Sequence, residues 1–217
     1  MMGMSSSQPR SVKISDNERG GWSSDRPRRA GEAERPPRKL DVSVRGRVLA
    51  PSDRMRYNPG SLVLIACADP QLRARFVKRV IDEQSSILSA DKVRGLLRGK
   101  VPEADLEAKT AQLLDAAITK RLAAGDSVTV PLETMEAAER ERFVRLAAVH
   151  RRPRHLVLVE IAKDGVPEEA REALGELRTA LDAGELGQEG FMTSLRLGGR
   201  VIDELKKIVF SPPPSDD

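Results

Sequence analysis

Residues 61–68 read SLVLIACA, and this continuous apolar run decides the fold class. A run of this kind is typical of a strand that is buried on both faces of a parallel sheet. The next segment, Gln71 to Glu83, has its apolar residues at helical spacing, which predicts an amphipathic helix. A second apolar run, RHLVLVEI at 154–161, predicts another buried strand farther along the chain. The two runs indicate an α/β domain.

The segments around these two strands alternate between strand and helix patterns. Further strands are predicted at 85–89 and 126–132, and helices at 91–98, 103–124, 134–149 and 167–183. Thr134 is the expected N-cap of its helix, and Gly125 and Gly184 are expected helix stops. The last stretch, FMTSLRLGGRVIDELKKIVF, has a Gly198-Gly199 break before a final helix or strand. Alternation of this kind predicts a three-layer domain over 61–210, with a parallel sheet flanked by helices.

Composition divides the chain into a basic N-terminal tail and a nearly neutral domain. Residues 1–39 are rich in Ser, Arg, Pro and Gly without periodicity, which predicts disorder. We expect residues 40–60 to form a short strand and linker, and residues 211–217 to form a flexible C-terminus. The first 60 residues carry 13 Lys/Arg and 7 Asp/Glu, a net charge of +6 within a chain total of +4. Any attraction to polyanions is therefore expected from the tail.

Cysteine and histidine usage argues against several classes of site. Cys67 is the only cysteine, and the two histidines, His150 and His155, precede or begin one predicted strand. A zinc site needs three or four ligands, so we expect no metal site. Cys67 ends a buried strand and is expected to be a small core residue. The N-terminus lacks an apolar signal segment and no run is long enough to span a membrane, so a cytoplasmic location without membrane contact is expected.

The junction after the first strand is where an α/β sheet binds ligands. A phosphate-binding P-loop would place G-x-x-x-x-G-K-[ST] there, so that backbone N–H groups wrap the phosphate. The chain has CADPQLRA at 67–74 instead. Cys67 and Leu72 replace the two glycines, Arg73 replaces the Lys, and Ala74 replaces the hydroxyl residue that binds magnesium.

Two further residues of this loop oppose an anion. Asp69 places a negative charge where the phosphate would lie, and Pro70 removes one backbone donor. Each change alone is tolerable, but together they predict that the anion cradle is lost. For Arg73 two interpretations stay open: it binds an anion at the helix N-terminus, or it is a solvated helix charge.

Several later motifs are spaced as in a known family. SADKVR at 89–94 corresponds to an S-x-D-x-x-R segment, and KRLAAGD at 120–126 to a basic turn before the third strand. PLET at 131–134 stands where that family has D-x-T-N, and VPEE at 166–169 opens the helix after the fourth strand. The E-G-F element of that family is also present, at 189–191. With these motifs, residues 61–191 resemble the bacterial polynucleotide 5′-hydroxyl kinase-like group of P-loop phosphotransferases.

The resemblance implies an ATP- and magnesium-dependent phosphotransferase fold, from which this chain departs. The P-loop is degenerate, and the Arg-rich lid before VPEE is missing. By resemblance, Asp91 matches the general base; otherwise its carboxylate belongs to the first turn of a short helix, where it is favoured. Arg94 matches a residue that could bind a substrate phosphate, or is a solvated helix residue.

Three function hypotheses follow. The first is a non-catalytic pseudoenzyme domain that acts as an interaction or regulatory subunit with a protein partner and no cofactor. The second is a polynucleotide-kinase-like phosphotransferase with an aberrant loop, which would use ATP and Mg²⁺. The third is weak nucleic-acid binding through the basic tail without sequence preference. Phosphoryl transfer depends almost entirely on positioning and electrostatics, so the altered loop favours the first hypothesis.

Overall fold

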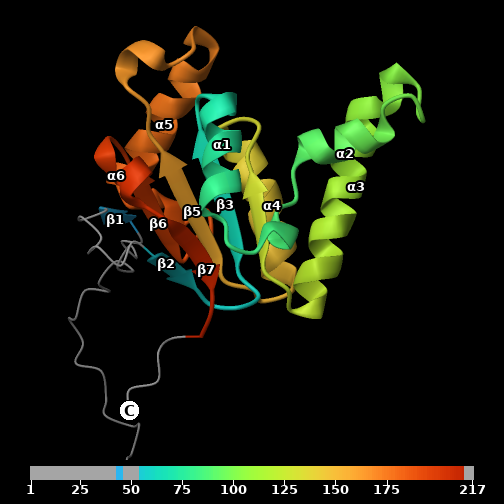
Figure 1. Cartoon of the computed structure of the whole chain (residues 1–217), viewed down its shortest axis with the longest axis horizontal. Coiled ribbons are helices and arrows are strands. Elements are labelled where there is room, and N and C mark those ends of the chain that lie inside the picture. The colour runs from blue at the N-terminus through green and yellow to red at the C-terminus, as the bar shows by residue number, and fades with distance from the viewer. Residues whose placement is uncertain (1–42, 46–53, 213–217) are drawn as a thin grey trace, which may run out of the picture. The chain divides into compact units, whose positions relative to one another are not determined.

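A computed structural model describes residues 43–45 and 54–212 of the chain (Figure 1). Seven strands and six α-helices are found in these ranges, joined by four short 3₁₀ helices. The strands are β1 (Ser43–Arg45), β2 (Arg54–Tyr57), β3 (Leu62–Cys67), β4 (Val128–Pro131), β5 (Arg154–Val159), β6 (Thr193–Leu197) and β7 (Lys207–Phe210). The helices are α1 (Pro70–Val80), α2 (Ala90–Leu97), α3 (Glu103–Ala124), α4 (Ala137–Val149), α5 (Arg171–Asp182) and α6 (Arg200–Glu204).

The strand predicted from the first apolar run, β3, is the second-last of five strands in a parallel sheet of order β1-β6-β5-β3-β4. β3 pairs with β5 over its whole length, from Leu62 opposite Arg154 to Cys67 opposite Val159. β4 pairs with its other side. All six β3 residues are buried, because neighbouring strands cover both edges and helices cover both faces.

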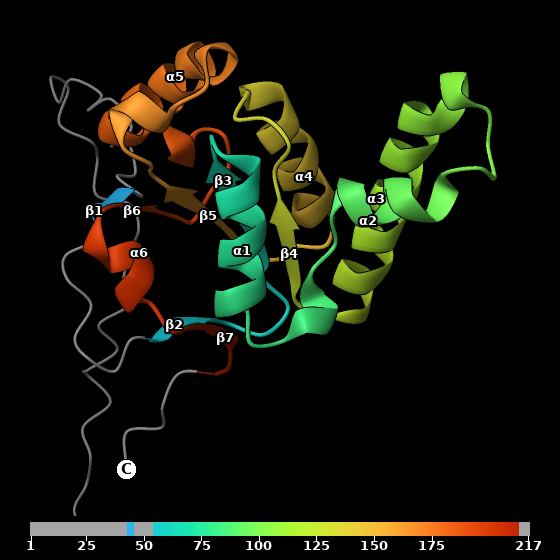
Figure 2. The ribbon, with the colours of Figure 1, turned by 45° about the horizontal axis from the view of Figure 1, so that its top comes forward.

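Alternate β3 side chains enter two different cores. Leu62, Leu64 and Ala66 join a cluster with residues of α3, α4 and α5. Val63, Ile65 and Cys67 face the opposite side and join a cluster with residues of α1, α6 and β7. Figure 2 shows α1 in front of the sheet and α4 behind it. The period of two in β3 therefore produces three layers, and the predicted α/β class with a parallel sheet flanked by helices is confirmed.

The chain reverses its direction across the sheet between β3 and β5. After β3 it passes through α1 toward β4 on one side, and after β5 it passes through α5 toward β6 on the other. The two helices lie on opposite faces, as their membership of different cores shows. The connections that leave the strands on either side of such a switch point run in opposite directions and leave a crevice, which is where ligands bind in this class of sheet.

The long helix α3 begins and ends where its sequence predicts. Gly125 takes the left-handed conformation (φ 89°), and its N–H bonds the carbonyl groups of the last turn. Leu106, Thr110, Leu114 and Ile118 of α3 are buried, whereas its apolar residue Leu113 is 47% exposed. The buried side of α3 is therefore a narrow stripe rather than a wide face.

Two local predictions were wrong. Residues 85–89 do not form a strand: Gln84–Ser86 is a 3₁₀ helix, and only Ile87 bridges to Thr129 of β4. The hydroxyl of Ser86 donates to the carbonyl of Glu83 (2.7 Å), a local bond that competes with strand pairing.

The start of α4 also differs from the prediction. Thr134 does not cap it, because the helix begins at Ala137. Instead, the Glu139 carboxylate accepts hydrogen bonds from Thr134 N (2.7 Å) and Thr134 Oγ1 (2.8 Å). The carboxylate of the first helical turn thus holds the preceding turn in place.

The domain also uses strands near both ends of the described chain. β1 pairs with β6, and β2 pairs with β7 in a separate two-stranded parallel sheet. Part of the predicted linker 40–60 thus belongs to the domain. The predicted disordered tail 1–39 and most of the C-terminus 211–217 lie outside the described residues. Within the described ranges, no helix combines the length and apolar character needed to cross a bilayer.

Candidate functional site

The loop after β3 ends in a capped helix rather than a phosphate cradle. Asp69 is the N-cap of α1, and its Oδ1 accepts hydrogen bonds from Gln71 N (2.8 Å) and Leu72 N (3.2 Å). Pro70 occupies the first helical position, where its missing N–H costs nothing and its fixed φ suits the helix. The Asp69 carboxylate therefore bonds the backbone donors that a helix N-terminus would otherwise present to an anion.

Arg73 lies where a P-loop has its lysine, and it is only 7% exposed. Its Nη1 lies 3.5 Å from the carbonyl oxygen of Cys67 and 3.4 Å from that of Glu133. The interpretation of Arg73 as a solvated helix charge was therefore wrong. The first turn of α1 packs against the ends of β3 and β4, which removes this side chain from water.

Arg94 is the centre of an ion-pair cluster. Its guanidinium bonds Glu107 of α3 through Nε (2.7 Å) and Nη2 (2.9 Å), Asp91 through Nη1 (2.8 Å), and Glu133 through Nη2 (2.8 Å). Hydrogen bonds to Glu107 and Glu133 raise the pKa of Arg94, and Arg94 lowers the pKa of Glu107. Only 17% of the Arg94 side chain is exposed, so its interpretation as a solvated residue was also wrong.

Asp91 lies in the first turn of α2, as its helical interpretation predicted. Ser89 caps this helix by accepting a hydrogen bond from Lys92 N (3.3 Å). The Asp91 side chain is 78% exposed and pairs with Arg94. A carboxylate in this position stabilises the helix N-terminus and shares one arginine with two other carboxylates.

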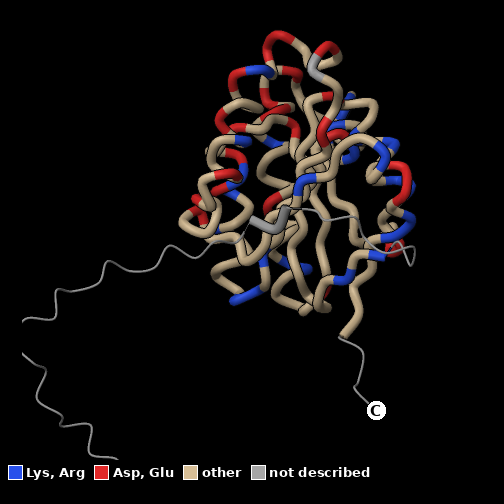
Figure 3. The backbone as a smooth tube through the Cα atoms, turned by 90° about the vertical axis from the view of Figure 1, so that its left-hand side faces the viewer, with Lys and Arg blue, Asp and Glu red and all other residues tan. Residues whose placement is uncertain are grey.

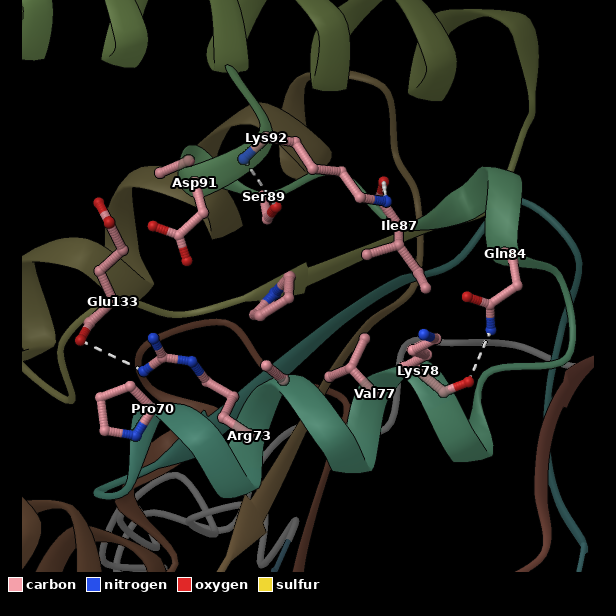
Figure 4. Close-up of a pocket in the computed structure, with 13 residues that line it drawn as sticks. Pro70, Arg73, Val77, Lys78, Gln84, Ile87, Ser89, Asp91, Lys92 and Glu133 are labelled. Carbon is pink, nitrogen blue, oxygen red and sulfur yellow. Dashed lines mark hydrogen bonds between the residues drawn. The ribbon is translucent and has the colours of Figure 1, made fainter. Parts of the chain in front are cut away.

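A cavity of about 370 Å³ lies between α1 and the segment that leads into α2 (Figure 4). It brings together Arg73 and Asp91, two of the three residues singled out from sequence. Arg94 does not line it. The remaining lining residues are Pro70, Ala74, Val77, Lys78, Gln84, Ile87, Ser89, Ala90, Lys92, Pro131 and Glu133.

A second cavity of about 290 Å³ lies at the carboxyl ends of β3 and β4, beside the start of α5. Its lining combines apolar residues with three carboxylates, Glu133, Glu136 and Glu169. Figure 3 shows acidic residues concentrated at the upper end, which holds α5 in Figure 1. This edge of the sheet therefore opposes, rather than attracts, a highly charged anion.

The segment between β5 and α5 lies where the family resemblance would place an Arg-rich lid. It contains two short 3₁₀ helices, Lys163–Gly165 and Glu168–Ala170, and α5 follows at once. The arginines of α5 are engaged: Arg171 pairs with Glu168, and Arg178 pairs with Glu160 at 2.7 Å.

Cys67 faces the α1 core and is 2% exposed, as expected of a core residue. Burial raises the pKa of its thiol, which disfavours the reactive thiolate. In the part of the chain that the structure describes, no group of three or more His, Cys, Asp or Glu residues is arranged to hold a metal ion.

The ion pair between Arg140 and Glu189 is a feature that sequence reasoning missed. Arg140 of α4 donates to both carboxylate oxygens of Glu189 (Nε to Oε2 2.9 Å, Nη2 to Oε1 2.7 Å) and to the carbonyl of Met135. Glu189 belongs to the EGF motif, and Phe191 of that motif is in the core. The EGF motif therefore has a packing role in this domain. In the sequence, only its place after the last predicted long helix drew attention to it.

The strand order and the three layers define an α/β domain with a parallel sheet flanked by helices, in which Asp69 caps the helix that follows β3. No protein-family model matches the chain, and no curated protein matches it in sequence. Among solved structures, it is similar to the tunicamycin resistance protein of Deinococcus radiodurans, with 15% identity over 70% of this chain and 99% of that chain (TM-score 0.39). It is also similar to a gluconokinase from Sinorhizobium meliloti 1021, with 11% identity over 69% and 91% of the two chains (TM-score 0.36).

Proposed function

We propose that this chain is a non-catalytic domain of the P-loop-kinase-like fold that acts as an interaction or regulatory subunit. The observation that carries the proposal is the position of the Asp69 carboxylate, which accepts the N–H groups of Gln71 and Leu72. A nucleotide phosphate would have to displace the Asp69 carboxylate from these two N–H groups. The carboxylate would then compete with the bound phosphate for the same donors. Its negative charge also opposes the approach of the phosphate.

The other groups needed for phosphoryl transfer are absent, buried or paired. Ala74 has no oxygen to bind magnesium, and Arg73 is buried at the start of α1. Arg94 is matched by three carboxylates. Because phosphoryl transfer is accelerated by positioning and charge stabilisation, these features remove its main sources of catalysis.

The alternative is an ATP-dependent phosphotransferase with an aberrant loop, in which Asp91 would accept the proton of the acceptor hydroxyl. It requires Asp69 to leave the helix N-terminus and Asp91 to leave Arg94. The arrangement of these two carboxylates supports the non-catalytic proposal over this alternative.

Calorimetry of the full chain with millimolar ATP and Mg²⁺ tests the proposal. We expect no saturable, magnesium-dependent binding and no nucleotide turnover. A dissociation constant below about 100 μM, equivalent to ~5.5 kcal/mol, would contradict the proposal.

A variant identifies the cause of the missing affinity. Asp69→Gly frees the donors of Gln71 and Leu72, so we expect it to bind inorganic phosphate more tightly than the natural chain does. Ser89→Gly removes the cap of a different helix, α2, and is the matched control. If both variants behave alike toward phosphate, the Asp69 carboxylate is not what excludes the anion.

The interaction role has its own test. The tagged full chain should retain a protein partner from its native host through washes at high salt. A chain that stays monomeric and retains no partner, while showing nucleotide turnover, would favour the phosphotransferase.

A further inference from the structure

Arg73 is a buried cation that lacks a carboxylate partner within the ranges the structure describes. Buried charges in proteins are normally paired, because an unpaired charge in a low-dielectric environment is costly. Arg94 and Arg140, whose side chains are mostly buried, obey this rule, since each lies within 2.9 Å of a carboxylate oxygen. Among the described residues, Arg73 contacts only two carbonyl oxygens, both at distances longer than the usual range for a hydrogen bond.

The unused donors of Arg73 lie beside a cavity. A guanidinium has five N–H donors, and both contacts of Arg73 are made through Nη1. Arg73 lines the 370 Å³ cavity between α1 and α2, and Figure 4 shows its side chain rising from α1 toward Glu133 and Asp91. Its Nε and Nη2 are therefore available to a molecule that enters the cavity.

The rest of the cavity is largely apolar. Val77 of α1 faces Ile87 across it, and Ala74, Ala90 and Pro131 also line it. Lys78 and Lys92 are exposed at its edge and keep its surroundings favourable for an anion. A volume of 370 Å³ is at the lower end of the range for small-molecule sites. A compact molecule with an apolar body fits these walls.

We propose that this cavity binds a small organic monocarboxylate with an apolar body, whose carboxylate pairs with Arg73. A carboxylate matches the fork geometry of a guanidinium, and its body would cover the apolar walls. The proposal rests on the proposed function, because it requires Arg73 to be free of nucleotide phosphate. The bound molecule would then be the signal to which this non-catalytic, regulatory domain responds.

Local charge favours a monoanion over a phosphate. Asp91 and Glu133 also line the Arg73 end of the cavity, and they are only partly neutralised by Arg94, which they share with Glu107. A dianionic phosphate would meet stronger repulsion from these two carboxylates than a single carboxylate would. A ligand with a cationic head would instead be repelled by Arg73.

Four probes separate these possibilities in titrations of the full chain. Octanoate carries the proposed head and body, whereas octanol and octylamine keep the body and change the head. Inorganic phosphate keeps a negative charge without the body. We expect octanoate to bind at least about tenfold more tightly than octanol, because one charge-assisted pair is lost. Phosphate and octylamine are expected to bind more weakly than octanoate.

Two variants and two matched controls locate the site. Arg73→Gln should weaken octanoate binding to the level of octanol, whereas Arg75→Gln on the exposed side of the same helix should not change it. Ala74→Phe fills the cavity from an exposed position and should abolish binding of octanoate and octanol alike. Ala116→Phe, at an exposed position of α3 away from the cavity, is its control.

Equal binding of octanoate and octanol, or unchanged binding by Ala74→Phe, would overturn the proposal. If Arg73→Gln fails to fold, the comparison of head groups and the Ala74→Phe variant still decide it. The ATP titration is a separate measurement. Nucleotide binding with no octanoate binding refutes both proposals, whereas absence of both ligands refutes only the carboxylate site.

Discussion

Replacing Glu189 with Gln should destabilise the domain more than any change at an exposed ion pair. The substitution keeps the size of the side chain but removes the charge that faces Arg140. The Arg140 side chain is 4% exposed and that of Glu189 is 17% exposed, so water cannot replace the lost charge. Arg140 would keep only a neutral amide and the carbonyl of Met135 as acceptors.

The magnitude follows from this burial. Removing one partner of a buried pair typically costs about 3–5 kcal/mol, since the other charge stays buried. The Gln amide oxygen still accepts one hydrogen bond, so we expect a loss of about 3 kcal/mol in the free energy of unfolding. For a domain of this size, that loss corresponds to a melting temperature lower by roughly 6–12 °C.

Urea unfolding of the natural chain and of Glu189→Gln measures this loss in free energy. An unchanged m-value would show that both chains expose the same surface on unfolding. Glu168→Gln is the matched control, because the Glu168–Arg171 pair is 80% and 55% exposed. It should cost no more than about 1 kcal/mol. Replacing both members of the buried pair, with Arg140→Met and Glu189→Leu, should recover most of the loss. If Glu189→Gln costs no more than Glu168→Gln, the buried pair does not act as argued.

Two further predictions concern acid stability and the tail. Burial lowers the pKa of His155 from 6.5 to about 4, and Tyr57 packs on its ring at 4.4 Å. The unfolded chain therefore binds a proton that the folded chain does not, and the free energy of unfolding should fall by roughly 3 kcal/mol from pH 7 to pH 4. Urea unfolding across this range should show a smaller fall for His155→Gln. If the pH dependence of the variant parallels that of the natural chain, His155 is not the group responsible. Deleting residues 1–39 should leave the melting temperature unchanged and weaken binding to labelled duplex DNA. For the full chain, the slope of the logarithm of the DNA-binding constant against the logarithm of salt concentration should be no steeper than about −5. A shortened chain that binds DNA equally well would place that site in the folded domain.

The buried strands and the longest helix were predictable because their patterns are strong. β3 and β5 are continuous apolar runs, since helices cover both faces of the sheet. α3 ends at Gly125, which takes the left-handed conformation that favours glycine. β6 was missed because it has Ser194 and Arg196 between apolar residues, so its run is broken. The pairing of β2 with β7 joins segments at opposite ends of the domain, and no local pattern carries that information.

The candidate site was predictable only in part. The sequence shows that CADPQLRA lacks the glycines, lysine and hydroxyl of a P-loop. It also contains an Asp followed by Pro, the signature of a helix N-cap and first position, which shows where the Asp69 carboxylate should bond. The interpretation of Asp69 as a repulsive charge is therefore incomplete, because its carboxylate also caps α1.

The charge pairing around the site depended on tertiary structure. Asp91 and Arg94 are three residues apart on one helix, so their pairing follows from sequence spacing. Glu107 and Glu133 reach the same guanidinium from α3 and from the turn after β4. Helical and strand periodicity determine which faces are buried, because burial follows the repeat of each element. The partner of a buried charge depends on how elements distant in sequence pack together, and the unpaired state of Arg73 beside its cavity was therefore visible only in the folded domain.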